Sequence, residues 1–238
     1  IILREAGIKV PILLFASTLP EQAAEVALLD VIPVIHDMPS LEAFASLNKY
    51  LKVFFKIDSG MGRLGLVEHQ WEPAFEKLKN TPSLNLIGLY THMSKPEDPK
   101  ITTKQNKVFQ KACNIAELNG FSGFERIAAS SRIAIDYPEL HYTAVDVGRM
   151  LLGMLGPPWD QKLPMKPAVR AVKSRIIQVQ DHPPGSSLGI GYGNPIVNKN
   201  LLRTAVIPIG FSDGLNHAPP LGEVLVSGQR VSVLGRRS

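Results

Sequence analysis

Short apolar runs alternate with longer amphipathic stretches from Pro11 to about Gly153. The apolar runs have the length and the β-branched or aromatic content of buried strands, and the stretches between them carry apolar residues at helical spacing. Strands are predicted at Pro11–Phe15, Val31–Ile35, Val53–Asp58, Leu84–Tyr90, Ile127–Ala129 and Ala144–Val147. Helices are predicted at Pro20–Leu29, Leu41–Asn48 with Ser40 as its cap, Trp71–Lys79 and Thr103–Asn119.

This alternation predicts a parallel sheet whose strands are joined by right-handed crossovers. A closed barrel of the TIM type needs eight strands, and the pattern supplies about six. The chain also opens inside a helical pattern that Gly7 ends. We therefore expect an α/β fold that is a partial (β/α)8 TIM-type barrel, with the first two βα units absent from the sequence.

The pattern changes after Gly153. Residues 154–167 are rich in proline and lack periodicity, which is typical of a linker or a domain boundary. Beyond them helical patterns disappear, and we predict an all-β C-terminal domain. Its predicted strands are Ala168–Val179, Leu201–Ile209, Glu223–Val226 and Arg230–Leu234, with a hairpin turn at 227–229. The predicted domains are residues 1–157, which form the partial barrel, and residues 158–238, which form part of the β domain.

Composition narrows the function classes. The chain has 238 residues, 45% of them hydrophobic and 20% charged, which is typical of a globular protein. The net charge of +5 comes without a basic run, so we expect no nucleic-acid partner and an anionic small ligand instead. No apolar run is long enough to span a membrane, and no secretory signal is present. We expect a cytoplasmic protein.

Polar residues or glycines follow the ends of the predicted strands. In a β/α barrel these carboxyl ends share the face that carries the chemistry. The most informative of these segments is residues 52–66, KVFFKIDSGMGRLGL, where an apolar strand ends at a charged, glycine-rich turn. The strand-end residues are His36, Lys56, Asp58, His92, Ser130, Ser131 and Gly148.

Residues 52–66 resemble the Lys-x-Asp-Thr/Ser-Gly-Met-Gly-Arg-x-Gly segment of alanine racemases. The resemblance continues in order along the chain, through six further segments. The barrel segments alone are shared with other pyridoxal-phosphate barrels, such as decarboxylases of basic amino acids, whereas those of the β domain are particular to the racemases. The segments are 88–94 (GLYTHMS), 128–148 (AASSRIAIDYPELHYTAVDVG), 167–179 (PAVRAVKSRIIQV), 187–195 (SLGIGYGNP), 207–215 (IPIGFSDGL) and 222–236 (GEVLVSGQRVSVLGR).

The resemblance implies a homodimeric enzyme with shared active sites that uses pyridoxal 5'-phosphate to interconvert L- and D-alanine, supplying D-alanine for peptidoglycan. In this family, two bases move the α-proton of the amino acid. One is the lysine that carries the cofactor, and by family pattern it lies upstream of Ile1. The other corresponds to Tyr192 of the partner subunit, and His92 lies near the cofactor ring and this tyrosine. A phenol has an ordinary pKa of about 10, so this base needs cationic or hydrogen-bonding neighbours.

The resemblance also implies which residues bind the cofactor. Arg63 corresponds to the arginine that approaches the cofactor's phenolic oxygen, and Lys56 to a lysine that is carbamylated in many family members. Ser131, Gly148 and Arg149 correspond to the phosphate site. A serine such as Ser131 can also act as a helix N-cap, and one serine can fill both roles. No metal ligand is expected.

Two departures from the family pattern leave alternatives open. Asp146 stands where the family usually has an arginine facing the pyridine nitrogen, and Phe211 replaces a tyrosine of the entry channel. Asp146 would favour a protonated ring nitrogen, a stronger electron sink and more side transamination. The alternatives are a racemase of another amino acid, such as serine or with broad specificity, and a non-catalytic fragment that binds pyridoxal phosphate. We expect the chain to begin and end inside the family's sequence and to be incomplete for catalysis.

Overall fold

A computed structural model describes residues 1–15, 18–188, 196–215 and 222–234 of the chain. It divides into two compact units, Ile1–Ala168 and Val169–Ser238, which are described separately below. Among the described residues, no helix is both long enough and apolar enough to cross a membrane.

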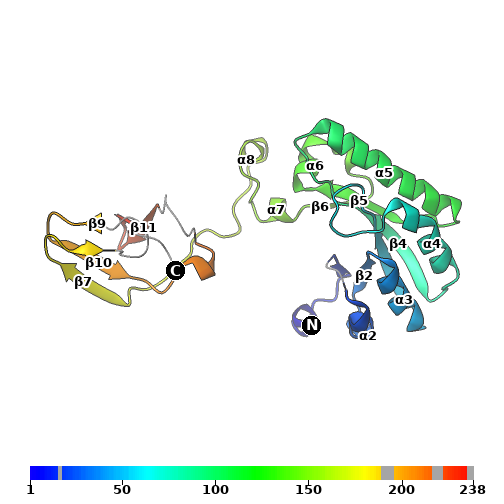
Figure 1. Cartoon of the computed structure of the whole chain (residues 1–238), viewed down its shortest axis with the longest axis horizontal. Coiled ribbons are helices and arrows are strands. Elements are labelled where there is room, and N and C mark those ends of the chain that lie inside the picture. Colours follow the sequence, from blue (N-terminus) through cyan, green and yellow to red (C-terminus); the bar gives the residue numbers. More distant parts are fainter. Residues whose placement is uncertain (16–17, 189–195, 216–221, 235–238) are drawn as a thin grey trace. The chain divides into compact units, whose positions relative to one another are not determined.

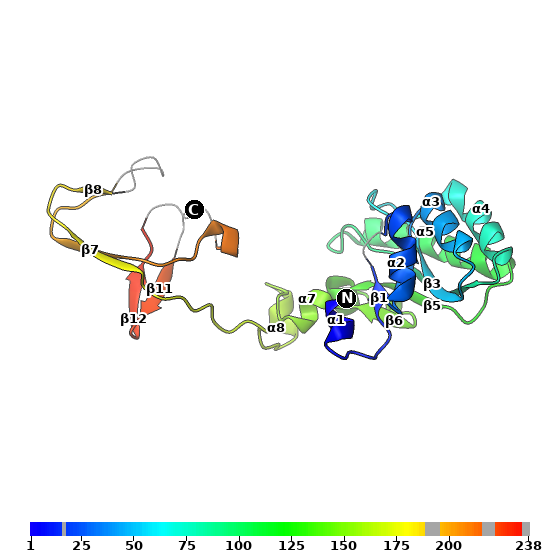
Figure 2. The same ribbon diagram turned by 90° about the horizontal axis from the view of Figure 1, so that it is seen from below.

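The first unit is built on one parallel sheet of six strands that are hydrogen-bonded in sequence order (Figure 1). Figure 2, turned by 90°, shows the same strands curling into an open half-barrel. The prediction of a partial barrel followed by a β domain is therefore confirmed. The strands are β1 (Leu13–Leu14), β2 (Ile32–Ile35), β3 (Leu51–Lys56), β4 (Leu84–Tyr90), β5 (Glu125–Ser130) and β6 (Ala144–Asp146).

Helices cover one face of this sheet, where α3, α4 and α5 gather in both views (Figures 1 and 2). Their apolar stripes bury large side chains, such as Trp71, Phe75 and Phe109, which are fully buried. The helices are α1 (Ile2–Glu5), α2 (Ala23–Leu28) after the turn η1 (Pro20–Gln22), α3 (Met38–Ser46), α4 (Glu68–Lys79), α5 (Pro99–Leu118), α6 (Ser131–Asp136), α7 (Gly148–Leu151) and α8 (Trp159–Lys162). The turn η2 (Pro138–Leu140) follows α6.

Strand β3 divides its side chains between two environments. Val53 and Phe55 pack in the core beneath the helices. Phe54 points to the other face, where it joins a second cluster with Val34, Tyr90 and Ile127. Successive side chains of a strand alternate between faces, so Lys56 lies on the same face as Phe54. The ammonium of Lys56 accordingly lies over the ring of Tyr90.

Three predicted helix starts are wrong. Helix α4 starts at Glu68 rather than Trp71. At the other two, an aspartate outside the apolar pattern caps the helix. The Asp37 carboxylate, not Ser40, caps α3 and accepts a 2.8 Å hydrogen bond from the Ser40 amide. Helix α5 starts at Pro99 rather than Thr103, since the Asp98 carboxylate accepts hydrogen bonds from the amides of Lys100 and Ile101. Each capped helix then has proline in its first turn, where its missing N–H costs nothing.

The second unit consists of short antiparallel strand pairs. They are β7 (Gln178–His182) with β10 (Leu202–Val206), β8 (Ser187–Leu188) with β9 (Ile196–Val197), and β11 (Glu223–Val226) with β12 (Gln229–Ser232). The predicted turn is present, with positive φ at Ser227 and Gly228, as a two-residue hairpin needs. The predicted strand Ala168–Val179 is wrong for most of its length: pairing with β10 begins at Gln178, and the residues before it join no ladder within the described chain.

Candidate active site

Polar side chains meet at the carboxyl ends of β3, β4 and β6. Lys56 and Tyr90, the last residues of β3 and β4, are register partners, and the Lys56 Nζ atom lies 4.9 Å from the Tyr90 ring centroid. The Tyr90 hydroxyl lies 3.1 Å from His92 Nδ1 and 3.3 Å from Asp146 Oδ2. Three residues singled out from the sequence, Lys56, His92 and Asp146, are thus brought together. Together with Tyr90, these three side chains form a group that we call the strand-end cluster.

Sequence reasoning missed Tyr90, which joins the other three. Its ring packs among apolar side chains, with the Phe15 ring centroid 4.5 Å away, so in the sequence it reads as the last core residue of a strand. The available signal was its spacing from His92. Residues two apart on a strand share a face, and His92 was already placed on the chemical face of the barrel.

The glycine-rich loop after β3 is held by Asp58. Its Oδ1 atom accepts hydrogen bonds from the amides of Gly60 (2.9 Å), Met61 (2.8 Å) and Gly62 (3.1 Å). Asp58 therefore organises the loop that carries Arg63, and its carboxylate is directed at backbone amides. The loop closes where the Leu66 amide donates to the Lys56 carbonyl at 2.8 Å.

The cluster perturbs its own titratable groups. Burial is the main cause that lowers the pKa of Lys56, and the positive charge of Arg63 lowers it further against the opposing carboxylates of Asp58 and Asp146. Burial also lowers the pKa of His92, so the imidazole is neutral at neutral pH; Asp146 opposes this shift, while Arg63 and Lys56 add to it. Burial and the Asp146 carboxylate raise the pKa of Tyr90, so its hydroxyl keeps its proton.

Ser131 connects two short helices. Its buried hydroxyl accepts a 3.1 Å hydrogen bond from the amide of Met150 in the first turn of α7. The alternative of Ser131 as the N-cap of its own helix is wrong, because Ser130 occupies that position. Beside it, a Cβ added to Gly148 would meet no atom within 4 Å, so the space next to the turn is open. The Nε atom of exposed Arg149 donates to the Met154 carbonyl at 3.2 Å.

Two residues singled out from the sequence are not among the described residues of the first unit. Tyr192 falls within residues 189–195, outside the described part of the chain. Phe211 belongs to the second unit, where it begins the turn η3 (Phe211–Asp213). In that turn the Gly210 amide donates to Asp213 Oδ2 at 2.8 Å.

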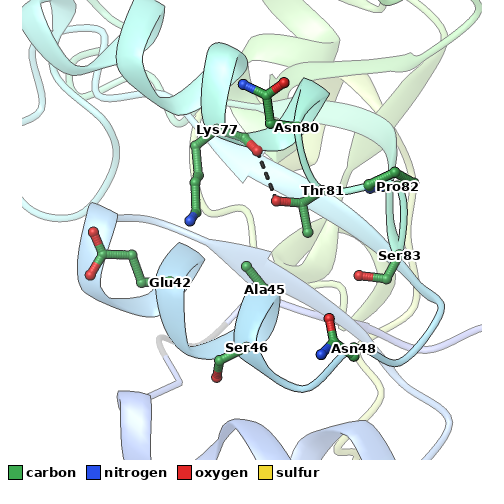
Figure 3. A pocket seen from close by; sticks show the side chains of 9 residues that line it. All are labelled: Glu42, Ala45, Ser46, Asn48, Lys77, Asn80, Thr81, Pro82 and Ser83. Atoms are coloured by element: carbon green, nitrogen blue, oxygen red, sulfur yellow. Dashed lines mark hydrogen bonds between the residues drawn. The ribbon is translucent and has the colours of Figure 1, made fainter.

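A pocket of about 360 Å³ lies at the opposite end of the strands (Figure 3). It is formed by the ends of α3 and α4 and by the segment that precedes Leu84, the first residue of β4. Its lining includes Glu42, Lys77 and Thr81, and the Thr81 hydroxyl donates to the Lys77 carbonyl at 2.8 Å. This pocket contains no residue of the strand-end cluster, so it is not the candidate site.

Replacing Lys56 with methionine is expected to raise the free energy of unfolding at neutral pH, with the gain shrinking as the pH approaches 10.5, the ordinary value for lysine. At pH values below the pKa of Lys56 in the folded state, the full free-energy cost of burying its charged ammonium is present. Between that pKa and 10.5 the unfolded chain binds more protons than the folded chain, so the stability of the lysine form rises with pH. Urea titrations across this range, in buffer free of carbon dioxide, measure the effect.

The matched control for this prediction is Lys52→Met, which changes an exposed lysine on the same strand. We expect it to show no such pH-dependent gain. A Lys56→Met gain that stays constant across the pH range would contradict the assignment of a lowered pKa to Lys56.

Comparison with known proteins identifies the relatives of both units. Residues 1–156 match the family described as alanine racemase, N-terminal domain, and residues 169–238 match alanine racemase, C-terminal domain. The chain is 30% identical over 243 residues to an alanine racemase of Methanococcus maripaludis, and 33% identical over 249 residues to one of Syntrophobacter fumaroxidans. These alignments cover 98% and 99% of this chain and 64% of each relative.

Solved structures show the same fold. An alanine racemase of Clostridium difficile superposes with a TM-score of 0.85 at 24% identity, covering 99% of this chain and 63% of that one. The Bacillus anthracis enzyme with bound L-Ala-P superposes with a TM-score of 0.79 at 24% identity, covering 100% of this chain and 63% of that one. The chain thus spans a little under two thirds of the length of these relatives.

Proposed function

Because this chain belongs to the alanine racemase family, we propose that it forms part of a pyridoxal-phosphate-dependent enzyme that interconverts L- and D-alanine. The observation that carries the proposal is the strand-end cluster. It places an imidazole, a buried amine and a carboxylate at one end of the barrel strands, where barrel enzymes carry their chemistry. We propose residues 1–157 as the cofactor-binding domain and residues 158–238 as part of the β domain.

The described residues fit pyridoxal 5'-phosphate, which combines an anionic phosphate with a heteroaromatic ring. Gly148 borders open space next to the Ser131 hydroxyl and the start of α7, which suits a phosphate. Arg149 adds a positive charge to this turn. Arg63, His92 and Asp146 would meet the ring substituents. When bound, the cofactor supplies an electron sink that makes the α-proton of an amino acid acidic.

We propose that His92 and Tyr192 handle the proton transfers on one side of the substrate. Neutral His92 can accept a proton at neutral pH, because burial lowers its pKa. By family resemblance, Tyr192 is contributed by the second subunit of a homodimer. Positioned acid–base groups of this kind contribute roughly 10²- to 10⁴-fold to a rate.

Lys56 is our candidate for modification. Its lowered pKa increases the fraction of neutral amine, which is the form that reacts with carbon dioxide. A carbamate at Lys56 would replace a cation with an anion, so the repulsion between Lys56 and Arg63 would become attraction. The orientation of Arg63 would then depend on this modification.

Two further functions stay open as alternatives. Asp146 and Phe211 depart from the family pattern, and a site distinguishes substrates that differ by a methyl-sized group by only about 1–3 kcal/mol, so serine or several amino acids could serve as substrates. A protein that binds the cofactor without turnover is the other alternative. We propose a cytoplasmic location and a role in supplying D-alanine to the cell wall from the family resemblance alone.

The test is to express the complete open reading frame that contains this sequence, add pyridoxal phosphate and measure D-alanine formed from L-alanine by chiral chromatography. Borohydride reduction followed by peptide mapping identifies any lysine that carries the cofactor. D-Alanine formation that requires the cofactor supports the proposal, faster formation of D-serine favours the first alternative, and a labelled lysine without turnover favours the second.

A further inference from the structure

The Tyr90 hydroxyl lies between a carboxylate and an imidazole, and its single proton can serve only one of them. An ionised carboxylate accepts hydrogen bonds and has no proton to donate. The contact between the Tyr90 oxygen and Asp146 Oδ2, at 3.3 Å, is therefore attractive only if Tyr90 is the donor. If Tyr90 donated to His92 instead, two oxygen lone pairs would face each other across this distance.

Once its proton is committed to Asp146, the Tyr90 oxygen can accept a hydrogen bond through its lone pairs. His92 Nδ1 lies 3.1 Å from it. For this contact to be a hydrogen bond, Nδ1 must carry the proton. A neutral imidazole protonated at Nδ1 has its lone pair at Nε2, and no hydrogen bond from another described residue reaches that atom.

We infer that Asp146 and Tyr90 are positioning residues that hold neutral His92 in the tautomer protonated at Nδ1, which makes Nε2 the proton acceptor of the strand-end cluster. The catalytic meaning of this inference depends on the proposed function, whereas the tautomer itself does not. When Nε2 takes a proton, Tyr90 keeps its own proton and continues to accept from Nδ1. The resulting imidazolium is linked to the Asp146 carboxylate through two hydrogen bonds.

The backbone between Tyr90 and His92 is held by hydrogen bonds that do not involve either of these side chains. Thr91, between Tyr90 and His92, points to the other face of the strand, where its buried hydroxyl donates to the Ile57 carbonyl at 2.9 Å and contacts the Ser59 hydroxyl at 2.8 Å. Contacts within the chain therefore hold the backbone from which Tyr90 and His92 extend.

The charges around His92 agree with a neutral ring in this arrangement. Asp146, on β6, is the group that raises its pKa, while Arg63, from the loop after β3, and Lys56, at the end of β3, lower it together with burial. Tyr90 remains able to donate, since burial and Asp146 both raise its pKa.

The experiment is ¹⁵N NMR of the histidine side chains in the full chain as purified, with the His92 signals identified by their loss in a His92→Gln variant. We expect a proton on Nδ1 and a non-protonated Nε2 at pH values above the His92 pKa. Asp146→Asn is nearly isosteric, but its amide can donate to the Tyr90 oxygen. In molecules where the amide donates, Tyr90 can donate to Nδ1; in those where the carbonyl of the new side chain accepts from Tyr90, the wild-type arrangement is kept. We therefore expect the population of His92 protonated at Nε2 to increase.

Asp146→Asn is also expected to lower the pKa of His92 further, since it removes the negative charge that raises this pKa. Tyr90→Phe removes the acceptor at Nδ1 and should also shift the population toward Nε2–H. The matched control is Tyr142→Phe, which removes another partly buried hydroxyl, one that donates to Asn106 Oδ1, and should leave both signals unchanged.

A wild-type His92 protonated at Nε2 would overturn the inference, and so would a folded Tyr90→Phe variant that keeps the wild-type population of Nδ1–H. If either variant does not fold, the wild-type tautomer decides alone. A protein that has the Nδ1–H tautomer but forms no D-alanine would support this inference while contradicting the proposed function, so the two failures are distinguishable.

Discussion

Replacing Gly65 with alanine is expected to lower the free energy of unfolding by on the order of 3 kcal/mol and to displace the loop that carries Arg63. Gly65 has a φ of +130°, a conformation that L side chains rarely adopt. An added Cβ would lie 2.5 Å from the Asp58 amide nitrogen and 2.8 Å from the Ile57 carbonyl carbon. These are backbone atoms at the end of β3, so they cannot rotate away as a side chain could.

Displacement of the loop at Gly65 would be transmitted through three hydrogen bonds next to it. The Leu66 amide donates to the Lys56 carbonyl, the Asp58 amide donates to the Leu66 carbonyl, and the fully buried Trp71 donates its indole N–H to the same carbonyl at 2.9 Å. Pushing Gly65 outward strains these three hydrogen bonds together. Urea denaturation measures the stability, and titration with pyridoxal phosphate measures the effect on the proposed cofactor site.

Gly62→Ala is the matched control, because Gly62 lies in the same loop and also has a positive φ, +70°. An added Cβ there meets no atom within 4 Å, so only the left-handed backbone cost of about 1–2 kcal/mol applies. Equal losses of stability in the two variants would show that glycine at position 65 is not required by the close approach of the Ile57 and Asp58 backbone.

The second large effect is expected at Tyr192. Tyr192→Phe should reduce racemisation about 10²- to 10⁴-fold while leaving cofactor affinity unchanged, because it would remove the proposed proton-transfer group without removing the aromatic ring. Steady-state kinetics in both directions, with a cofactor titration in parallel, measure the two quantities. The prediction comes from the family resemblance of residues 187–195.

Tyr50→Phe is the control for Tyr192→Phe. Tyr50 is exposed, and its hydroxyl accepts a hydrogen bond from Asn85 on the neighbouring strand. It should cost neither activity nor cofactor affinity. Tyr192→Phe with wild-type turnover would remove Tyr192 from the proposed mechanism and leave the base on that side to be found elsewhere.

The sequence predicts the barrel well because its central strands, β2, β3 and β4, are mostly buried runs of apolar residues. In β3 and β4 the apolar run and the observed strand nearly coincide, since burial on both faces leaves no polar alternation to obscure the pattern. The helix starts were less predictable. Asp37 and Asp98 cap their helices from positions that lie before the apolar periodicity begins.

The candidate site was predictable to the extent that polar residues mark strand ends. Lys56 and His92 could be placed on one face of the sheet from that rule alone, whereas Asp146 was singled out only by the family resemblance. Tyr90 could not, because a tyrosine at the end of an apolar run has the same appearance whether its hydroxyl reaches water or a carboxylate. Asp58 was also ambiguous, because an aspartate at a strand end can face a ligand or hold a turn. The structure shows that its carboxylate binds three amides of the loop.

Tyr90 has a further consequence for anyone who wishes to alter the specificity of this protein. Its ring packs against Phe15 while its hydroxyl contacts His92 and Asp146, so one side chain supports both the barrel interior and the polar rim. Substitutions that remove this ring are expected to lower stability and to change the polar rim at the same time, so a library at this position couples the two effects. Diversity is better introduced at exposed positions outside the proposed cofactor site, where new side chains can be tolerated without repacking the interior.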